Sequence, residues 1–203
     1  MSRTKWQGGA LLAPVPPTMV TCAHGGVKNV FTVAWTGIIN TKPPKTYIAV
    51  RPQRFSYELI KNSGEFVINL TTASLCRKAD MCGTYTGRKV DKFQKCSLEI
   101  CDSFEVASPA LADSPVSLEC KVTDIIELGT HHMFLADIVC VSVDERFIDK
   151  SGKLCLGKAD LAAYVHGDYY SLGKRIGSFG YSVRKKKKPI TGTFSQKQNK
   201  DSK

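Results

Sequence analysis

Six separate segments of this chain are rich in Val, Ile, Thr and aromatic residues, and they constrain its fold more than any other feature. This composition is typical of β-strands. The six segments are 19–22, 30–35, 46–50, 65–70, 116–128 and 132–143. Because they follow one another at short spacing, with helices inserted instead of alternating regularly, they favour a barrel over a doubly wound parallel sheet. We therefore predict a mainly β protein of the α+β class, a β-barrel with inserted helices.

Two segments between the predicted strands carry helix signals. The first begins near Ser56, whose hydroxyl can cap exposed amides, and ends before Gly64, a residue common just past a helix end. The second runs from Leu75 to Cys82. Residues 83–114 are rich in turn residues and are expected to form a long excursion over the barrel, a place where function is often carried.

The charge of the chain is concentrated at one end. The formal net charge is +11, but residues 184–203 hold eight Lys or Arg and one Asp, which leaves only +4 for the rest. That end lacks the apolar residues needed to offset the entropy of ordering. We therefore predict one domain over residues 1–183 and a basic, disordered tail over 184–203. Attraction of the tail to nucleic acid or to an anionic surface is the alternative, which we do not favour.

No sequence feature points to a membrane, a secretory route or a metal. No apolar run approaches the roughly 20 residues of a membrane span, and Pro14, Pro16 and Pro17 interrupt the N-terminal candidate for a signal core. The eight cysteines include no CxxC pair and the histidines form no ligand cluster, so no metal site is predicted. We expect a cytoplasmic protein with reduced, mostly structural thiols. Cys76 and Cys82 are the candidates for a reactive thiol.

Residues 31–37 combine features that suit a flat ligand. Side chains alternate along this predicted strand, while the small residues Ala34 and Gly37 let backbone amides approach a planar ring closely. Trp35 adds an apolar wall. Periodicity alone favours the plainer interpretation, an ordinary buried strand.

Residues 51–57 combine features that suit an anion. Arg51 and Arg54 directly follow a predicted strand, and Ser56 lies at the predicted helix start. A helix N-terminus with guanidinium and hydroxyl groups nearby is a natural anion site. The alternative is that the arginines are ordinary surface residues and that Ser56 only caps its helix. Together with the strand before it, this segment offers amides, an apolar surface and phosphate donors, which are the three things a flavin site needs.

The order of these parts resembles the flavin reductase-like family, the FMN-binding split barrels. The family pattern has a strand ending in Thr-x-(Ala/Ser)-Trp, a Pro-Pro turn, an (Arg/Ser)-Pro-x-Arg-x-(Ser/Thr) element and Gly-Glu-Phe-x-(Val/Ile)-Asn. In this chain the matching elements are 32–35, 43–44, 51–56 and 64–69, followed by 91–93, 129–138 and 169–173. The resemblance covers about residues 14 to 182.

The resemblance implies which residues contact the cofactor. Those implied at the flavin ring, through their backbone, are Thr32, Val33, Ala34 and Trp35. Those implied at the phosphate are Arg51, Arg54, Ser56 and Tyr57. Asn69 and Leu70 would lie near the ribityl chain or the ring, and Lys92 and His131 would reach the site from the long loop and a later strand. Since His131 and His132 adjoin one strand, they point to opposite faces, and one alone can serve the site. A hydrogen-bonded barrel histidine is the alternative for His131.

The resemblance also implies a function. A homodimer would bind FMN and pass electrons from NADH or NADPH through it to a small acceptor, a partner protein or oxygen. No side chain need act as a general acid or base, because the flavin carries the redox chemistry, although His131 is placed to contribute. The sequence accordingly contains no recognisable catalytic triad. A flavoredoxin-like electron carrier with little reductase activity of its own is the alternative.

Overall fold

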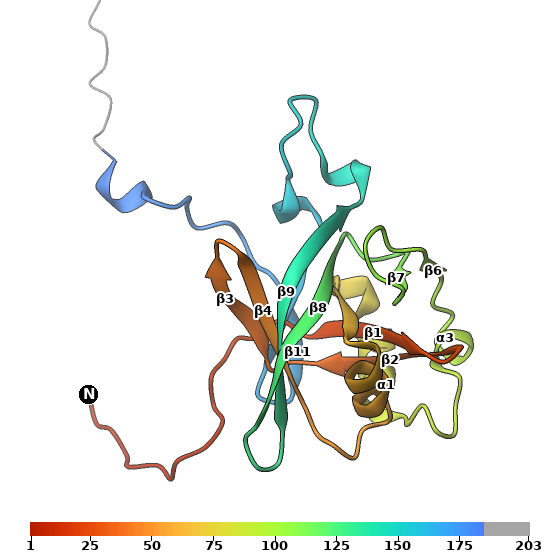
Figure 1. Ribbon diagram of the computed structural model, residues 1–203. Helices are drawn as coiled ribbons and strands as arrows, with labels where there is room; N and C mark the ends of the chain where they lie inside the picture. Colours follow the sequence, from red (N-terminus) through yellow and green to blue (C-terminus); the bar gives the residue numbers. More distant parts are fainter. Residues whose placement is uncertain (185–203) are drawn as a thin grey trace, which may run out of the picture. The chain divides into compact units, whose positions relative to one another are not determined.

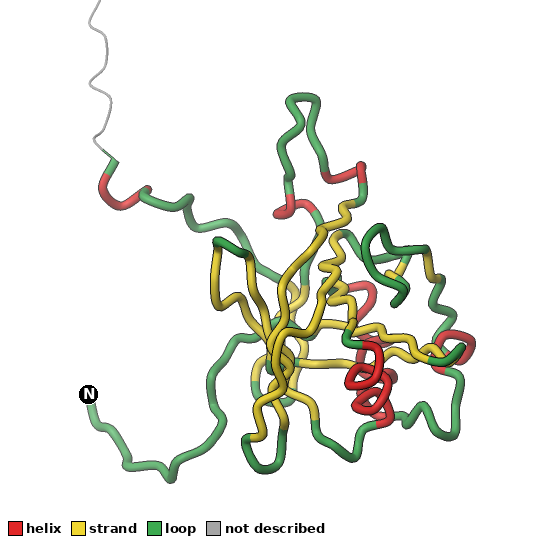
Figure 2. Tube along the Cα trace, in the orientation of Figure 1, coloured by secondary structure: helices red, strands yellow, loops and turns green. Residues whose placement is uncertain are grey.

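The computed structural model describes residues 1–184 (Figure 1). It divides into a unit of residues 1–172, which holds all the described strands, and a unit from residue 173 onward, described as far as residue 184. The second unit contains a 3-10 turn at Tyr181–Val183. Apart from Arg184, the tail predicted to be disordered lies outside the described residues. Strands outweigh helices in the first unit (Figure 2), which confirms the mainly β prediction.

A seven-stranded antiparallel sheet forms the centre of the first unit. In spatial order its strands are β2 (Val27–Val33), β1 (Thr18–His24), β5 (Glu65–Asn69), β8 (Val116–Glu127), β9 (His132–Val143), β4 (Pro44–Val50) and β3 (Thr36–Thr41). The two longest strands, β8 and β9, pair along their whole length. All six predicted strands are therefore present, with bounds that shift by a few residues.

The two edge strands of the sheet, β2 and β3, follow each other in the sequence. Ala34 and Trp35 alone link them, so the edges approach each other at this end while no ladder joins them. The barrel is split at this place. The strand predicted to include both linking residues ends just before them. The sequence does not predict β3, because its apolar residues Ile38 and Ile39 are adjacent and the alternation that marks a strand is missing. Both side chains are exposed in the structure.

Helix α1 (Phe55–Ser63) packs its apolar face against the interior of the barrel, where it joins the buried side chains of the strands, while its other face is exposed. It ends as predicted at Gly64, which has a φ of 69° and donates its amide to the Ile60 carbonyl over 2.8 Å. Its start differs from the prediction. Arg54 occupies the N-cap position, and the Ser56 hydroxyl caps no amide because Ser56 already lies within the helix.

A second layer covers the outer face of β1 and β2. Helix α2 (Cys76–Thr84), preceded by the 3-10 turn Ala73–Leu75, buries Ala79 and Cys82 in a cluster with Met19 of β1. These bounds are close to those predicted for the second helix. Helices therefore lie on both faces of the β1–β2 pair, and this pair is held from inside and outside the barrel.

The remaining elements are short. They are α3 (Lys92–Lys95), β6 (Ile100–Cys101), β7 (Ala110–Leu111), 3-10 turns at Glu145–Phe147 and Leu156–Lys158, and the hairpin β10 (Ala162–Val165) with β11 (Asp168–Ser171). The first three lie in the long excursion that the sequence predicts after α2. A bridge between Val15 and Tyr164 attaches the hairpin to the segment before β1. None of the described helices is long and apolar enough to cross a membrane.

Candidate functional site

Two adjoining cavities lie beside the split in the barrel. The first, called the aromatic cavity, has a volume of about 320 Å³, and the second, called the cationic cavity, has a volume of about 440 Å³. The residues that line both are Phe31, Thr32, Arg51, Arg54 and Gly83. Each volume is in the range of a small-molecule site. Because the cavities share these walls, one elongated ligand can occupy both.

The two cavities differ in their other walls. The aromatic cavity also has Pro17, Val33, Ala34, Trp35, Ala49, Val50, Asp80, Thr84, His131, Tyr164 and Tyr169. The cationic cavity also has Asn29, Gln53, Phe55, Ser56, Tyr85, Thr86, Gly87 and Lys92. The first set is drawn from segments far apart in the sequence, while the second comes from three short segments.

The end of β2 and its link to β3 form one wall of the aromatic cavity. Thr32, Val33, Ala34 and Trp35, the residues predicted at a flavin ring, all line it. No described strand pairs with the outer side of β2, so alternate backbone groups there have no ladder partner and can meet a ligand. The Thr32 hydroxyl is occupied, since it donates to the carbonyl of Ala79. This wall therefore offers backbone polar groups more than side-chain ones.

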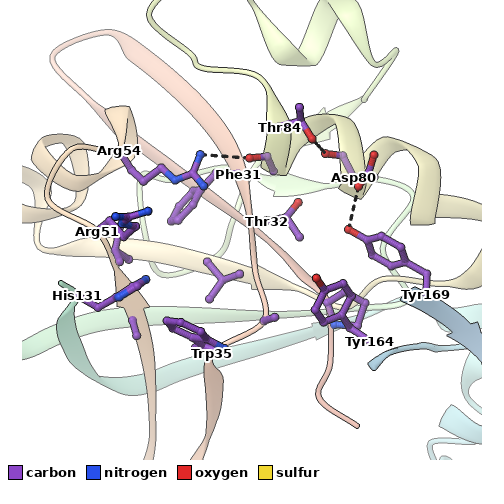
Figure 3. Close-up of a pocket in the computed structure, with 16 residues that line it drawn as sticks. Phe31, Thr32, Trp35, Arg51, Arg54, Asp80, Thr84, His131, Tyr164 and Tyr169 are labelled. Carbon is purple, nitrogen blue, oxygen red and sulfur yellow. Dashed lines mark hydrogen bonds between the residues drawn. The ribbon is translucent and has the colours of Figure 1, made fainter. Parts of the chain in front are cut away.

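Aromatic rings form the other walls (Figure 3). The rings of Trp35 and His131 have their centroids 4.5 Å apart. Tyr164 and Tyr169, on the other side of the cavity, pack edge to face at 5.2 Å. The Tyr169 hydroxyl donates to Asp80 Oδ1 over 3.4 Å. Burial, with the nearby Asp80 carboxylate, raises the pKa of Tyr169 to about 12, so this wall is an uncharged phenol at neutral pH.

The two adjacent histidines take different sides, as neighbours along a strand do. His131 lines the aromatic cavity, whereas His132 Nδ1 lies 2.8 Å from the hydroxyl oxygen of the buried Tyr57. Burial, with the positive charges of Arg51 and Arg54, lowers the pKa of His131. The His131 imidazole is therefore neutral at neutral pH and can donate or accept a hydrogen bond in the cavity.

Arg51, Arg54 and Lys92 bring positive charge to the cationic cavity. Arg54 Nη1 donates to the Gly83 carbonyl over 3.2 Å. Lys92 is only 3% exposed, and its Nζ donates to the Cys82 carbonyl over 2.7 Å. Burial lowers the pKa of Lys92, because a charged amine loses its hydration there. An anion in this cavity would replace that hydration.

The first turn of α1 faces the cationic cavity. Phe55 and Ser56 line it, and no side chain caps the start of the helix. The first amides of a helix have no partner within the helix, and the positive end of the helix dipole lies there. Ser56 is 1% exposed, and its hydroxyl accepts a hydrogen bond from Asn29 Nδ2 over 2.7 Å. The start of α1 therefore adds to the three cations of an anion site.

Gly87 allows the loop after α2 to approach the start of α1. A Cβ at this position would lie 2.4 Å from Asn29 Oδ1 and 2.5 Å from Phe55 Cδ1, distances that a real side chain cannot adopt. Glycine is therefore required for this wall of the cationic cavity. Together the two cavities can hold one molecule with a flat, partly apolar end and an anionic end.

Three predicted site residues, Tyr57, Asn69 and Leu70, line neither cavity. Tyr57 is 5% exposed and its hydroxyl is held by His132. Asn69 is fully buried and its amide group already has partners in the core. Those partners are Met19, Thr21, Val67, Leu111 and Ser117. Leu70 donates its amide to the Val116 carbonyl and continues the packing between β5 and β8. The structure therefore gives these three residues roles in the barrel and not in the cavities.

Several lining residues were not predicted. The stretch from Gly83 to Gly87 lines both cavities, and its sequence, Gly-Thr-Tyr-Thr-Gly, offers hydroxyls between two glycines, a usable signal for a phosphate-binding loop. Tyr169 lies in the matching element 169–173, to which the sequence assigns no role. Asp80 and Tyr164 carry no local signal, because helix α2 and the β10–β11 hairpin alone bring them to the cavity.

Known proteins resemble this chain over most of its length. An uncharacterised protein of Archaeoglobus fulgidus is 32% identical over 148 residues, which are 73% of this chain and 79% of that protein. The flavoredoxin of Desulfovibrio vulgaris (Miyazaki F) superposes with a TM-score of 0.83 at 25% identity, covering 90% of this chain and 100% of that one. An FMN-binding protein of Thermus thermophilus shares the fold, with a TM-score of 0.74 at 21% identity, covering 88% of this chain and 99% of that one.

The family comparison agrees with the resemblance seen in the sequence. The model of the flavin reductase like domain matches residues 11–173, a range that includes every residue lining the two cavities. The structural neighbours have the same split-barrel fold. This chain therefore belongs to the flavin reductase-like family.

Proposed function

We propose that this chain binds FMN across the two cavities and passes electrons from NADH or NADPH through it to a small acceptor, a partner protein or oxygen. The observation that carries the proposal is the wall shared by an aromatic cavity and a cationic one. A flat ring system joined to a phosphate needs this combination. Membership of the flavin reductase-like family supports it, and the FMN-binding protein of Thermus thermophilus has the same fold.

The residues present fit this cofactor. Arg51, Arg54 and Lys92, with the first amides of α1, would hold the phosphate through charge-assisted hydrogen bonds. The backbone at the end of β2 would face the polar edge of the ring, and Trp35 would cover apolar surface. Ser56, which also lines this cavity, would donate its hydroxyl to the same phosphate.

The chain itself contributes binding, orientation and exclusion of water. When bound, FMN supplies the redox chemistry, because it exchanges a hydride or electrons with its partners. The rings of Trp35, Tyr164 and Tyr169 limit the access of water to the aromatic cavity. His131, neutral at neutral pH, can hold a proton at one ring nitrogen and accept one at the other, and it adds no charge beside the ring.

We place this activity in the cytoplasm, a reducing compartment in which thiols persist. All eight cysteines of the chain are free, which is consistent with such a compartment. Nicotinamide donors would enter the aromatic cavity, which Asp80 and Tyr169 help to line. No dedicated nucleotide fold is needed for this approach, since the donor would meet the ligand already bound.

The absorption spectrum of the purified protein and its reaction with nicotinamide donors test the proposal. We expect yellow protein with a flavin band at about 450 nm, a property of the cofactor. Under anaerobic conditions NADH or NADPH should bleach this band within the time of catalytic turnover. Colourless protein that does not bind added FMN would overturn the FMN proposal. Bound FMN that neither donor reduces would overturn the reductase proposal alone.

A second candidate function is that of a flavoredoxin-like electron carrier. The observation that favours it is the superposition on the flavoredoxin of Desulfovibrio vulgaris, which spans the whole of that chain. A carrier would retain FMN through dialysis and would oxidise NADH and NADPH only slowly. Steady-state oxidation of both donors by the FMN-loaded protein separates the candidates, since a reductase turns over many times and a carrier does not.

We also propose that the chain functions as a homodimer. Ile38 and Ile39 of the edge strand β3 are 61% and 49% exposed, and Val139 and Val141 of β9 are 39% and 50% exposed. An edge strand with exposed apolar side chains is a common self-association surface. Light scattering coupled to size exclusion should give twice the chain mass of 22.3 kDa. A monomer at micromolar concentration would contradict the proposal, and Ile38→Lys with Ile39→Lys should convert the dimer to monomers.

A further inference from the structure

Two buried thiols lie in contact directly behind the cationic cavity. Cys82 Sγ and Cys96 Sγ are 3.9 Å apart, and the two side chains are 0% and 5% exposed. Cys82 is near the end of α2, and Cys96 directly follows α3. A disulfide has its sulfur atoms about 2.05 Å apart, so a closure of about 1.9 Å would bond them.

The same two residues position the cations of the cavity. The Cys82 carbonyl accepts the hydrogen bond from Lys92 Nζ over 2.7 Å, and the Cys96 amide donates to the Lys92 carbonyl over 3.0 Å. The next carbonyl after Cys82, that of Gly83, accepts the hydrogen bond from Arg54 Nη1 over 3.2 Å. Any displacement of the end of α2 therefore moves the acceptors of both Lys92 and Arg54.

We propose that Cys82 and Cys96 form a redox-sensitive pair that hydrogen peroxide converts to a disulfide, and that this disulfide weakens anion binding in the cationic cavity. Nothing in the redox chemistry of FMN requires such a pair. The disulfide itself is independent of the proposed function, whereas its effect on affinity rests on FMN binding in these cavities.

The oxidation has a complete balance with hydrogen peroxide as the oxidant. The sulfur of the slightly more exposed Cys96 attacks one peroxide oxygen, the O–O bond breaks, and the departing hydroxide takes the thiol proton to form water. The Cys82 sulfur then attacks the resulting sulfenic sulfur. The S–S bond forms, the S–O bond breaks, and the second hydroxide leaves as water with the Cys82 proton. Two thiols and one peroxide thus give one disulfide and two waters.

Burial of the two thiols slows their reaction with oxidants. Burial, with the adjacent Cys96, raises the pKa of Cys82 to about 12, so Cys82 rests as a thiol and not as a thiolate. Hydrogen peroxide is small and uncharged and can reach a thiol at the edge of a buried cluster. Oxygen-driven turnover of a reduced flavin would form this oxidant in the neighbouring cavities.

The disulfide closes a short loop that contains five of the thirteen residues lining the cationic cavity. Residues 83–95 lie between the two cysteines and include Gly83, Gly87 and Lys92. Cross-linking the ends of this loop restricts its conformations. We expect the bonded form to hold Arg54 and Lys92 away from their present positions.

Peptide mapping of the full chain, before and after stoichiometric hydrogen peroxide, tests the pair directly. We expect a Cys82–Cys96 cross-linked peptide that lacks the mass of two hydrogen atoms and that dithiothreitol separates. The FMN dissociation constant should rise about tenfold in the oxidised protein, the equivalent of part of one charge-assisted hydrogen bond, and should return on reduction. Sulfinic or sulfonic acids would not be reversed by dithiothreitol.

Matched variants separate the pair from general oxidation. Cys82→Ser and Cys96→Ser should each lose the cross-link and the peroxide effect on affinity. Cys76→Ser is the control, because Cys76 lies on the same helix and its Sγ donates a hydrogen bond to the Thr72 carbonyl. This variant should keep both the cross-link and the peroxide effect on affinity.

Each outcome decides one part of the proposal. Absence of the cross-link in the wild-type chain overturns the proposal without need of any variant. A cross-link that leaves FMN affinity unchanged overturns the coupling to the cavity. Failure of the reduced wild-type chain to bind FMN would instead contradict the proposed function, while the peptide map would still report on the cysteine pair.

Discussion

The two cavities share a wall but differ in how the chain builds them. The cationic cavity is lined by residues from three short stretches, 29–32, 51–56 and 83–92. The aromatic cavity adds residues as distant as Pro17, His131 and Tyr169. Charge and hydrogen-bond donors for an anion can come from one helix start and its neighbours, whereas a flat wall needs rings from several parts of the fold. The anionic end of the ligand site is therefore a local feature and the ring end a tertiary one.

The largest expected effect tests the cationic cavity. Arg51→Ala with Arg54→Ala removes two charge-assisted contacts of about 1.5 to 3 kcal/mol each, so FMN affinity should fall by roughly a hundredfold or more. Isothermal titration calorimetry measures the change. Arg77→Ala, an exposed arginine on α2 that lines neither cavity, is the matched control. Undiminished affinity in the double variant would contradict the phosphate assignment.

A residue that lines neither cavity should behave differently. Asn69→Ala leaves the Leu111 amide and the Ser117 hydroxyl without their buried acceptor, so the free energy of unfolding should fall by about 2 to 4 kcal/mol. Urea unfolding measures it, with the exposed Asn40→Ala as control. FMN affinity of the folded protein should not change. A large loss of affinity with little loss of stability would restore Asn69 to the cofactor site.

Gly87→Ala should disturb the cationic cavity through packing alone. The added methyl group must displace Asn29 or Phe55, at a cost of about 1 to 3 kcal/mol. We expect a lower melting temperature together with weaker FMN binding, measured by calorimetry on the same sample. Gly157→Ala is the control, since its Cβ would meet no atom within 4 Å. Equal melting temperatures and equal FMN affinities in the two variants would show that the loop accommodates the methyl group without cost.

Trp35→Ala sharpens the comparison from the aromatic side. The side chain is 46% exposed, so its loss should barely change the free energy of unfolding, while lost ring contacts should weaken FMN binding by about 1 kcal/mol. Fluorescence titration with FMN measures the affinity. Trp6→Ala, an exposed tryptophan outside both cavities, is the control. A hundredfold loss would mean that the ring end and not the phosphate end dominates binding.

The smallest effect concerns His131 and pH. Its pKa is lowered in the folded chain, so the unfolded chain binds more protons as pH falls through and below 6.5. The lowered pKa of His131 therefore decreases the free energy of unfolding below pH 6.5. At neutral pH it has no such effect. NMR titration of the FMN-free protein should give a His131 pKa below 6.5, rising in Arg51→Ala with Arg54→Ala. A His131 pKa that is the same with and without the two arginines would show that their charges do not act on His131.

The sequence predicts the local part of this molecule well. Strand composition locates β1, β2, β4, β5, β8 and β9, and Gly64 marks the end of α1, because these signals depend on neighbours along the chain. Arg51, Arg54 and Lys92 line the cationic cavity, and their contact with a phosphate stays a prediction. No local pattern could place Tyr164 and Tyr169 in the same cavity as Trp35, since more than a hundred residues separate them from it. The sequence cannot tell a buried structural amide such as Asn69 from a ligand-binding amide, because its hydrogen-bond partners come from distant segments.

The two-residue link between β2 and β3 limits the distance between these two edge strands beside the site. From the last residue of β2 to the first of β3 the chain takes three Cα steps, so the edges at this end cannot separate by more than about 11 Å. From there β2 and β3 run apart, and no comparable tether joins their far ends. The covalent chain therefore limits the separation of the two edges beside Ala34 and Trp35, which line the aromatic cavity.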